Sequence, residues 1–263
     1  MVSNLKELAV QLFDAGAVSL GDIEAKVGRR TPIYFDLRIV VSHPKIMTAI
    51  AKELQVLASE IEHDILCGVP YAALPIAAVM SVNTNTPMIM KRKETKLYAT
   101  KKILEGVYKP HQKCLVVEDV VTSGGSLLET VNTLRKELLS VTHAVVVLDR
   151  EQGGANVLKA NGVHVKEIFT MTELIKILRD AGRITDETVE IVSDHIRECQ
   201  FDTRSSRFFS MTARRHKMPA AHSATLIQWK KQKMNGIYLS ADLVTALASL
   251  NVYDFPHFVS CGT

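Results

Sequence analysis

Apolar and polar positions form a repeating pattern along roughly the first 200 residues of the chain. Apolar side chains recur at every third or fourth position in several segments, which predicts helices at 4–13, from Ser42 with Pro44 in the first turn, at 74–82, up to residue 138, at 172–180 and at 185–198. Between these segments, short apolar runs predict strands at 65–69, at 88–90, from Cys114 onward, at 144–148 and at 163–169. A turn-rich segment, 25–38, leads into one further strand.

Strands that alternate with helices predict an α/β fold with a central parallel sheet and helices on both faces. In such folds, ligands bind at the carboxyl ends of the strands. The strand from Cys114 has the most distinctive ending: three apolar residues, the acidic pair Glu118 and Asp119, two valines and then Thr-Ser-Gly-Gly-Ser at 122–126. We therefore expect a ligand site at this loop.

The loop at 122–126 has the composition of a phosphate-binding loop. Its glycines and small hydroxyl residues allow backbone N–H groups to converge on an anion at a helix start, where the helix dipole favours negative charge. It is not an ATP-type loop, because the lysine of Gly-x-x-x-x-Gly-Lys-Ser/Thr is missing. The two carboxylates before it suit the hydroxyl groups of a sugar such as ribose. A ribose phosphate is the ligand class that this stretch predicts, against the alternative of an ordinary strand-to-helix turn.

Composition narrows the class of protein. The chain has 263 residues, 47% of them hydrophobic, which suits one large domain or one domain plus a fragment. Its four cysteines stand far apart and its histidines form no metal-binding pattern, so we expect free thiols, a cytoplasmic location and no structural zinc site. The longest apolar stretch, 69–80, is short and holds two prolines, so no membrane span is expected, and no signal peptide is recognised.

Basic charge is concentrated in two places. The net charge is +4, but eight Lys/Arg and no Asp/Glu lie between Thr203 and Ala241, so the rest of the chain is not basic and no nucleic-acid partner is expected. The second basic segment, 91–102, interrupts the apolar pattern with the sequence KRKETKLYATKK. Taken alone, such a segment is by default a solvated loop or helix face.

Five stretches, in order, resemble the orotate phosphoribosyltransferases, in the form that begins animal UMP synthase. They are Lys26 and Gly28 with PIYFDLR at 32–38, GVPY at 68–71, RKETK at 92–96, the stretch 114–126, and LDREQGG at 148–154. The resemblance implies a type I phosphoribosyltransferase fold and a homodimer. It also implies transfer of the phosphoribosyl group of 5-phosphoribosyl 1-pyrophosphate (PRPP) to orotate, with Mg²⁺, in UMP biosynthesis.

The same resemblance implies which residues would bind PRPP. Glu118 and Asp119 would bind the ribose hydroxyls, and Mg²⁺ would be carried by PRPP, with any link to this pair made through water. The 5-phosphate would lie on the loop formed by Thr122, Ser123, Gly124, Gly125 and Ser126. The pyrophosphate would meet Tyr71 and a basic loop that reaches the neighbouring subunit, with Arg92, Lys93, Tyr98 and Lys96, the last matching the catalytic lysine.

Orotate is a planar anion, and its carboxylate suits the guanidinium group of arginine. Arg150 matches the residue that binds this carboxylate in the family, Thr122 can add a hydrogen bond, and Lys26 would lie near both substrates. Tyr34 and Phe35 could pack on the base, although neighbours on a strand point to opposite sides, so one of them should face the core. For Arg150, the alternative is a surface salt bridge with Asp149 or Glu151.

Two positions depart from the family pattern. After Lys96, relatives usually have Asp, Tyr or His, and Gly, whereas this chain has Leu97, Tyr98 and Ala99. A loop without that acid and glycine should be less flexible, which would change how fast it closes over the pyrophosphate and not which substrate is bound. At Val27, relatives usually have serine.

The chain after residue 201 is expected to be organised separately. We predict a phosphoribosyltransferase domain at 1–201, a basic linker at 202–221, and a fragment at 222–263 that resembles the opening of orotidine 5-monophosphate decarboxylase, with the sequence LSAD at 239–242. That family forms a TIM barrel, which takes about 250 residues, so the fragment supplies only a first β/α piece and no decarboxylase activity is expected.

Two other functions remain open at this level. One is a non-catalytic subunit that binds PRPP or associates with full-length UMP synthase, which Leu97, Ala99 and the short tail favour and the basic loop opposes. The other is a purine-specific relative, which Lys26 and Arg150 oppose.

Overall fold

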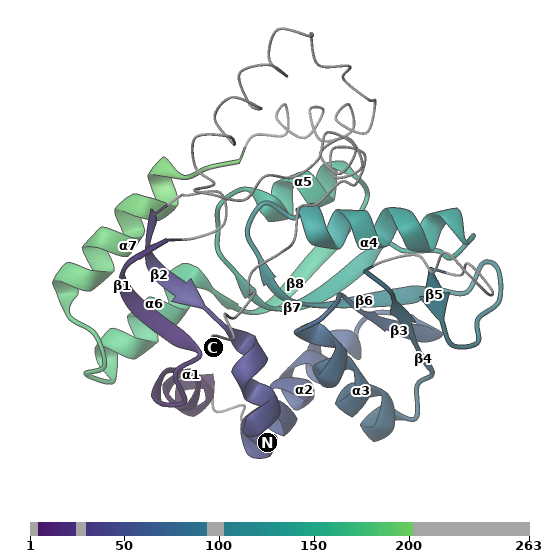
Figure 1. The fold of residues 1–263 in the computed structure, drawn as a ribbon, viewed down its shortest axis with the longest axis horizontal. Helices are drawn as coiled ribbons and strands as arrows, with labels where there is room; N and C mark the ends of the chain where they lie inside the picture. The colour runs from purple at the N-terminus through teal and green to yellow at the C-terminus, as the bar shows by residue number, and fades with distance from the viewer. Residues whose placement is uncertain (1–4, 25–29, 94–102, 202–263) are drawn as a thin grey trace, which may run out of the picture. The chain divides into compact units, whose positions relative to one another are not determined.

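A six-stranded sheet lies at the centre of the fold (Figure 1). This computed structural model describes residues 5–24, 30–93 and 103–201, which all belong to one compact unit, Met1–Ser210. The strands follow one another across the sheet as β5 (Leu104–Glu105), β4 (Met88–Lys91), β3 (Ile65–Gly68), β6 (Cys114–Val121), β7 (His143–Asp149) and β8 (His164–Thr170). Neighbouring strands are parallel, except that β5 pairs antiparallel with β4 at one edge. The predicted α/β fold is confirmed.

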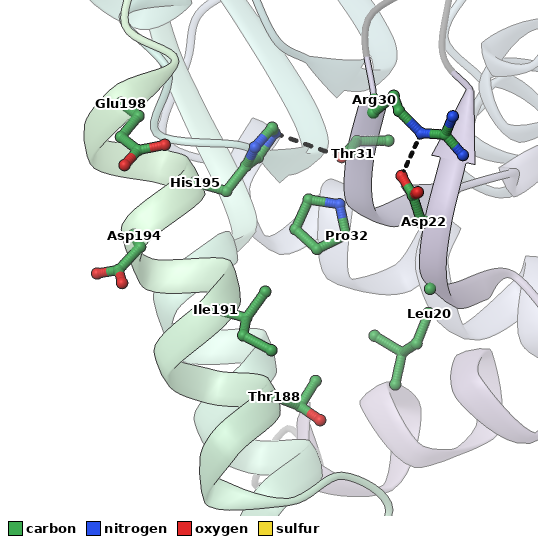
Figure 2. A pocket seen from close by; sticks show the side chains of 11 residues that line it. Leu20, Asp22, Arg30, Thr31, Pro32, Thr188, Ile191, Asp194, His195 and Glu198 are labelled. Atoms are coloured by element: carbon green, nitrogen blue, oxygen red, sulfur yellow. Dashed lines mark hydrogen bonds and ion pairs between the residues drawn. The ribbon is translucent and has the colours of Figure 1, made fainter.

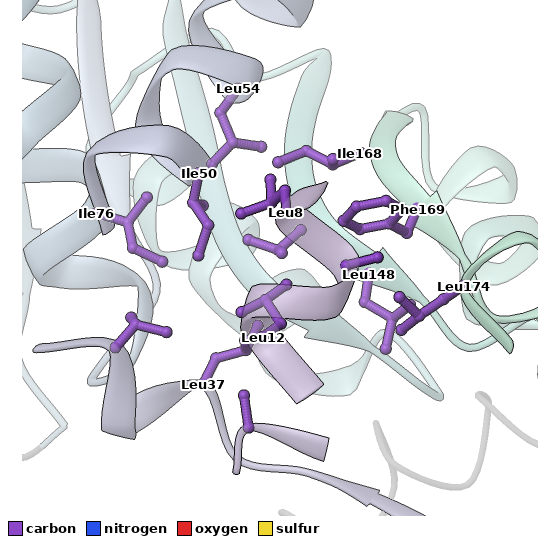
Figure 3. Packing of buried hydrophobic residues seen from close by; sticks show 14 of the residues in the cluster. Leu8, Leu12, Leu37, Ile50, Leu54, Ile76, Leu148, Ile168, Phe169 and Leu174 are labelled. Atoms are coloured by element: carbon purple, nitrogen blue, oxygen red, sulfur yellow. The ribbon is translucent and has the colours of Figure 1, made fainter. Parts of the chain in front are cut away.

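Side chains that alternate along the strands enter two separate cores, one on each face of the sheet. In β6, Leu115 and Val117 belong to the first core, and Cys114 and Val116 to the second. The first core (Figure 3) is covered by α1 (Leu5–Asp14), α2 (Pro44–Ala58), α3 (Ala73–Thr84) and α6 (Met171–Asp180). The second core lies under α4 (Gly125–Lys136) and α5 (Gly154–Ala160). Helices therefore cover both faces of the sheet, and a ligand can approach it at the ends of the strands.

A two-stranded hairpin is separate from the central sheet. β1 (Val18–Glu24) pairs antiparallel with β2 (Arg30–Phe35), and a 3₁₀ turn, Leu37–Ser42, follows. Strand β2 packs against α7 (Asp186–Glu198), which Figure 1 shows beside the hairpin. Helix α7 begins after Thr185, whose side chain accepts a hydrogen bond from the backbone N–H of Thr188. The hairpin and α7, far apart in sequence, therefore form one layer.

The structure corrects the sequence predictions at four places. Ser42 does not cap α2, because it belongs to the 3₁₀ turn and His43 takes the cap position without a side-chain hydrogen bond. Strand β1 was not predicted, since most of its residues are exposed and it lacks an apolar alternation. The two-residue strand β5 and the short helix α5, which follows Gly153, were also missed, because both are too short for a periodic pattern.

No helix within the described ranges is long and apolar enough to cross a membrane. The linker predicted at 202–221 and the fragment predicted at 222–263 lie outside the described residues.

Candidate active site

The register of the sheet brings three loops together. Val117 of β6 pairs with Gly68 at the end of β3, and Val121 of β6 pairs with Asp149 at the end of β7. The loops after β6 and β7 then touch: a Cβ on Gly154 would lie 2.4 Å from the backbone oxygen of Thr122. Glycine is therefore required at 154, and the predicted phosphate loop and the loop that carries Arg150 form one continuous surface.

The loop after β6 leads directly into α4, and the backbone N–H groups at the start of this helix can donate hydrogen bonds to an anion. Gly124 occupies the position before the helix with φ +75°, and no described side chain caps the helix start. The first backbone N–H groups of an α-helix lack partners within the helix, and the helix dipole places partial positive charge there. The geometry at 122–126 therefore suits an anion at the helix start.

Glu118 is a buried acid, with only 3% of its surface exposed. Its Oε2 accepts a hydrogen bond from Ser126 Oγ at 3.0 Å, and its Oε1 accepts one from the backbone N–H of Asp119 at 3.1 Å. Burial, with a further contribution from the neighbouring Asp119, raises the pKa of Glu118 well above its ordinary value. Asp119 is half-buried and presents the more accessible carboxylate of the pair.

Arg150 is a buried cation at the end of β7, with 9% of its surface exposed. Its Nη2 donates to Thr31 Oγ1 at 3.1 Å and to the backbone oxygen of Ile33 at 3.5 Å, whereas its buried Nε has no hydrogen-bond partner among the described residues. Burial lowers the pKa of this guanidinium below its ordinary value. Within the described ranges, no ion pair joins Arg150 to Asp149 or Glu151, so the alternative of a surface salt bridge is not what the structure shows.

Side chains of β2 alternate between the two faces of the strand, with Thr31, Ile33 and Phe35 on one face and Tyr34 on the other. Phe35 packs against the first core, which confirms that one of the two aromatic residues faces inward. Tyr34 points to the other side of the strand, where its hydroxyl lies 3.5 Å from Nη2 of Arg38. Arg38 itself is fixed by two hydrogen bonds to the carboxylate of Asp36, at 2.7 and 2.8 Å, which lower the pKa of Asp36.

The described part of the basic loop carries two residues of the predicted pyrophosphate site. Arg92 Nη1 lies 2.6 Å from Glu105 Oε1, so this arginine is paired with the edge strand β5. Lys93 Nζ lies 4.4 Å from the centre of the Tyr71 ring, which is 62% exposed. The structure thus brings Lys93 and Tyr71 together. Lys26, Lys96 and Tyr98 lie outside the described residues.

A cavity of about 640 Å³ lies between the hairpin and α7, as Figure 2 shows. Leu20, Asp22 and Arg30 line it from the hairpin, and Ile191, His195 and Glu198 line it from α7. None of the described candidates for substrate binding lines this cavity. Thr31 and His195 line the cavity, and Thr31 also contacts Arg150. Neither residue was predicted from the sequence, because neither belongs to a cluster of reactive side chains.

Comparison with known proteins now decides the family. Residues 39–176 match the model of the phosphoribosyl transferase domain. The orotate phosphoribosyltransferase of Caenorhabditis elegans is 40% identical over 187 residues, which cover 70% of this chain and 82% of that protein. The chain belongs to the orotate phosphoribosyltransferase family.

Some relatives are considerably longer than this chain. Uridine 5'-monophosphate synthase from Bos taurus is 37% identical over 95% of this chain, so the similarity continues beyond residue 201. The chain spans only 55% of that relative's length. The structure of UMP synthase from Leishmania donovani superposes with a TM-score of 0.69 and 32% identity, covering 74% of this chain and 42% of that one. The recognition of the family from its five motifs is confirmed.

Proposed function

We propose that this chain transfers the 5-phosphoribosyl group of PRPP to orotate, giving orotidine 5-monophosphate and pyrophosphate, in the synthesis of UMP. In this reaction the bond between C1 of the ribose and the pyrophosphate oxygen breaks, and pyrophosphate leaves with the electron pair. A ring nitrogen of orotate supplies the pair for the new C–N bond and releases its proton. The observation that carries the proposal is the buried, incompletely hydrogen-bonded Arg150 beside a phosphate-type loop.

Arg150 supports an anionic base as the second substrate. A buried charged donor without a partner is unfavourable, and Nε of Arg150 has none among the described residues, which supports a hydrogen bond from this nitrogen to a ligand. A carboxylate satisfies such a donor with a charge-assisted hydrogen bond. Orotate carries a carboxylate and the other common nucleobases do not, which supports orotate over a purine.

The loop after β6 supports PRPP as the first substrate. The start of α4, which no described side chain caps, suits the 5-phosphate, and Asp119 and Glu118 lie shortly before it on β6, where they would bind the ribose hydroxyls. Because Glu118 is buried and already accepts two hydrogen bonds, Asp119 is the better placed of the two for direct contact.

The same pair of acids fits Mg²⁺ that arrives with PRPP. Magnesium is usually held by one or two carboxylates together with substrate phosphates and water, and Glu118 and Asp119 offer such hard oxygen donors. Among the described residues, no group of three or more His, Cys, Asp or Glu could hold a metal ion, so in that part of the chain Mg²⁺ would depend on this pair together with substrate phosphates and water. When bound, Mg²⁺ neutralises charge on the pyrophosphate.

The basic loop supports a catalytic rather than a merely binding role. As the ribose–pyrophosphate bond breaks, negative charge develops on the leaving group, and fixed cations stabilise it. Lys93 and Arg92 are described at the base of this loop, and Lys96 follows as the proposed catalytic lysine. Loss of one such group typically costs about 10²–10³ in rate.

We also propose a homodimer, in which this loop reaches the neighbouring subunit. Exposed apolar side chains on neighbouring elements support it: Val82 of α3, Met90 of β4 and Val107 just after β5. Sedimentation of the purified chain tests the dimer. A cytoplasmic location is likewise a proposal, supported by the free thiols of Cys67, Cys114 and Cys199.

A turnover assay tests the proposed function. Orotate consumption and pyrophosphate release are measured with PRPP and Mg²⁺ for the wild type, Lys96→Ala and the control Lys159→Ala on α5. We expect turnover in the wild type and control, and a loss of about 10²–10³ in kcat for Lys96→Ala. Wild-type protein that binds PRPP without turnover would instead identify a non-catalytic, PRPP-binding subunit.

A further inference from the structure

A chain of polar contacts links Arg150 to α7. Arg150 Nη2 donates to Thr31 Oγ1 at 3.1 Å, and Thr31 Oγ1 lies 3.4 Å from His195 Nε2 (Figure 2). On the other side of the imidazole ring, His195 Nδ1 lies 3.6 Å from the sulfur of Cys199. The contacts join the end of β7, the hairpin strand β2 and the last turn of α7, which are far apart in sequence.

The hydrogen-bond directions along this chain follow from a count of protons. Thr31 has a single hydroxyl proton, and its closest acceptor is the backbone oxygen of Ile33 at 2.8 Å. With that proton donated to Ile33, Thr31 Oγ1 accepts from Arg150, and the His195 tautomer with its proton on Nε2 lets it accept from His195 as well. The backbone N–H of Ile33, at 3.5 Å, is the most distant of the three donors. The free Nδ1 of His195 accepts from the thiol of Cys199. Burial, followed by the charge of Arg150, lowers the pKa of His195, which keeps the ring neutral as this scheme requires.

Thr31 is well suited to hold a cation in one orientation. It is 4% exposed, sits in a strand, and is β-branched, so its hydroxyl has little rotational freedom. Nη2 of Arg150 donates hydrogen bonds to Thr31 and to the backbone oxygen of Ile33, which holds the guanidinium group in one orientation. Its Nε has no hydrogen-bond partner in the described part of the chain. A donor that is fixed before the ligand arrives loses less entropy on binding.

We propose that Thr31, oriented by His195, positions the Arg150 guanidinium for the carboxylate of the base, so that the hairpin and α7 determine the affinity for orotate. This inference rests on the proposed function. Thr31 and His195 are positioning residues, since neither needs to touch a substrate.

The backbone of the same loop is held by the residues that follow α7. The backbone N–H of Phe201 donates to the oxygen of Gln152 at 2.8 Å, and Nε2 of Gln200 donates to the oxygen of Glu151 at 2.9 Å. Residues 195–201 therefore contact the backbone of the Arg150 loop directly, and His195 reaches the Arg150 side chain through Thr31. This second set of contacts supports a positioning role for the end of α7.

Two substitutions distinguish the effect of the Thr31 hydroxyl group from the effect of the size of the side chain. Thr31→Val keeps the shape and removes the hydrogen bond, and Thr31→Ser keeps the hydroxyl. We expect Thr31→Val to raise the KM for orotate about tenfold, with kcat and the KM for PRPP within about twofold, and Thr31→Ser to stay near wild type. His195→Ala should raise the orotate KM about threefold, and His195→Gln should restore it, because its amide N–H can replace Nε2–H.

A double-mutant cycle then distinguishes positioning from a general structural role. In an Arg150→Ala background, Thr31→Val should have no further effect on the orotate KM. Equal effects of Thr31→Val with and without Arg150, or no effect of Thr31→Val while Arg150→Ala raises the orotate KM, would overturn this inference and leave the proposed function standing. An Arg150→Ala variant with unchanged orotate KM would overturn the proposed base site itself.

Discussion

Ser126, in the first turn of α4, donates a hydrogen bond of 3.0 Å from its Oγ to Oε2 of Glu118 on β6. This contact joins the proposed phosphate loop to the proposed ribose-binding acid. It also holds a carboxyl group that is almost completely buried. Burial raises the pKa of that group, so an ionised Glu118 is a source of instability in the free protein.

Glu118→Gln should therefore stabilise the protein at neutral pH. The folded-state pKa of Glu118 lies above its unfolded value, so the folded state binds the extra proton between the two values and the free energy of unfolding falls as pH rises through that window. Glutamine has no such dependence. We therefore expect Glu118→Gln to be more stable than the wild type at pH 8 and to differ little from it at pH 4.

Denaturant unfolding at the two pH values measures this gain, with the half-buried Asp119→Asn as the matched control. The same Glu118→Gln variant should bind PRPP more weakly. A stability difference that does not change between pH 4 and pH 8 would show that the pKa of Glu118 is not raised in the folded protein.

Gly153→Ala should be strongly destabilising and should also weaken orotate binding. A Cβ at this position would lie 2.3 Å from the backbone oxygen of Phe201, and the residue has φ +92°. Gly182→Ala is the control, because Gly182 has φ +68° but a Cβ there would meet no described atom within 4 Å. We expect the control to lose about 1 kcal/mol of free energy of unfolding, because of its positive φ alone, and Gly153→Ala to lose at least twice as much.

Chemical unfolding gives the two free energies, and steady-state kinetics gives the orotate KM. Equal losses of stability in the two variants would mean that the contact between Phe201 and the Arg150 loop contributes nothing.

Glu105→Gln should increase affinity for PRPP. In the free protein Arg92 is paired with Glu105 at 2.6 Å, and the pyrophosphate must compete with this carboxylate. Partly exposed ion pairs contribute up to about 1 kcal/mol, so the KM for PRPP should fall by up to about fivefold, and less in high salt. The control is Glu129→Gln, which removes the carboxylate paired with the neighbouring Lys91. A PRPP KM that is unchanged or higher in Glu105→Gln would argue that Arg92 does not leave Glu105 when PRPP binds.

Two of the described cysteines should resist thiol reagents in the folded protein. Burial raises the pKa of Cys67 to about 12 and that of Cys114 well above its ordinary value, and the thiolate is the reactive form. Cys199 is only partly buried and should react first of the three. Mass spectrometry after brief alkylation checks this order, with Cys199→Ser as the control. Labelling of Cys67 before Cys199 would contradict the described packing.

Local sequence patterns were sufficient for the main elements of the fold and for part of the site. The strand that ends in Glu118 and Asp119 and the glycine-rich loop after it are consecutive in sequence, so their chemistry could be predicted directly. The surroundings of Arg150 could not be predicted, because Thr31 contacts Arg150, and His195 contacts Thr31, through tertiary packing over long sequence separations. Strand β1 was missed for a related reason: its pairing with β2, rather than an apolar alternation, makes it a strand.

Arg150 provides the most direct test, because its buried Nε, unpartnered among the described residues, is the feature that we propose selects the base. The measurement is the orotate KM of Arg150→Ala beside that of Arg179→Ala, an exposed arginine of α6. Loss of a charge-assisted hydrogen bond to the carboxylate should raise the orotate KM by at least about tenfold, with the PRPP KM unchanged and the control at wild-type values. An orotate KM that is the same in Arg150→Ala and wild type would contradict the assignment of this residue to the base, and with it the proposed choice of orotate.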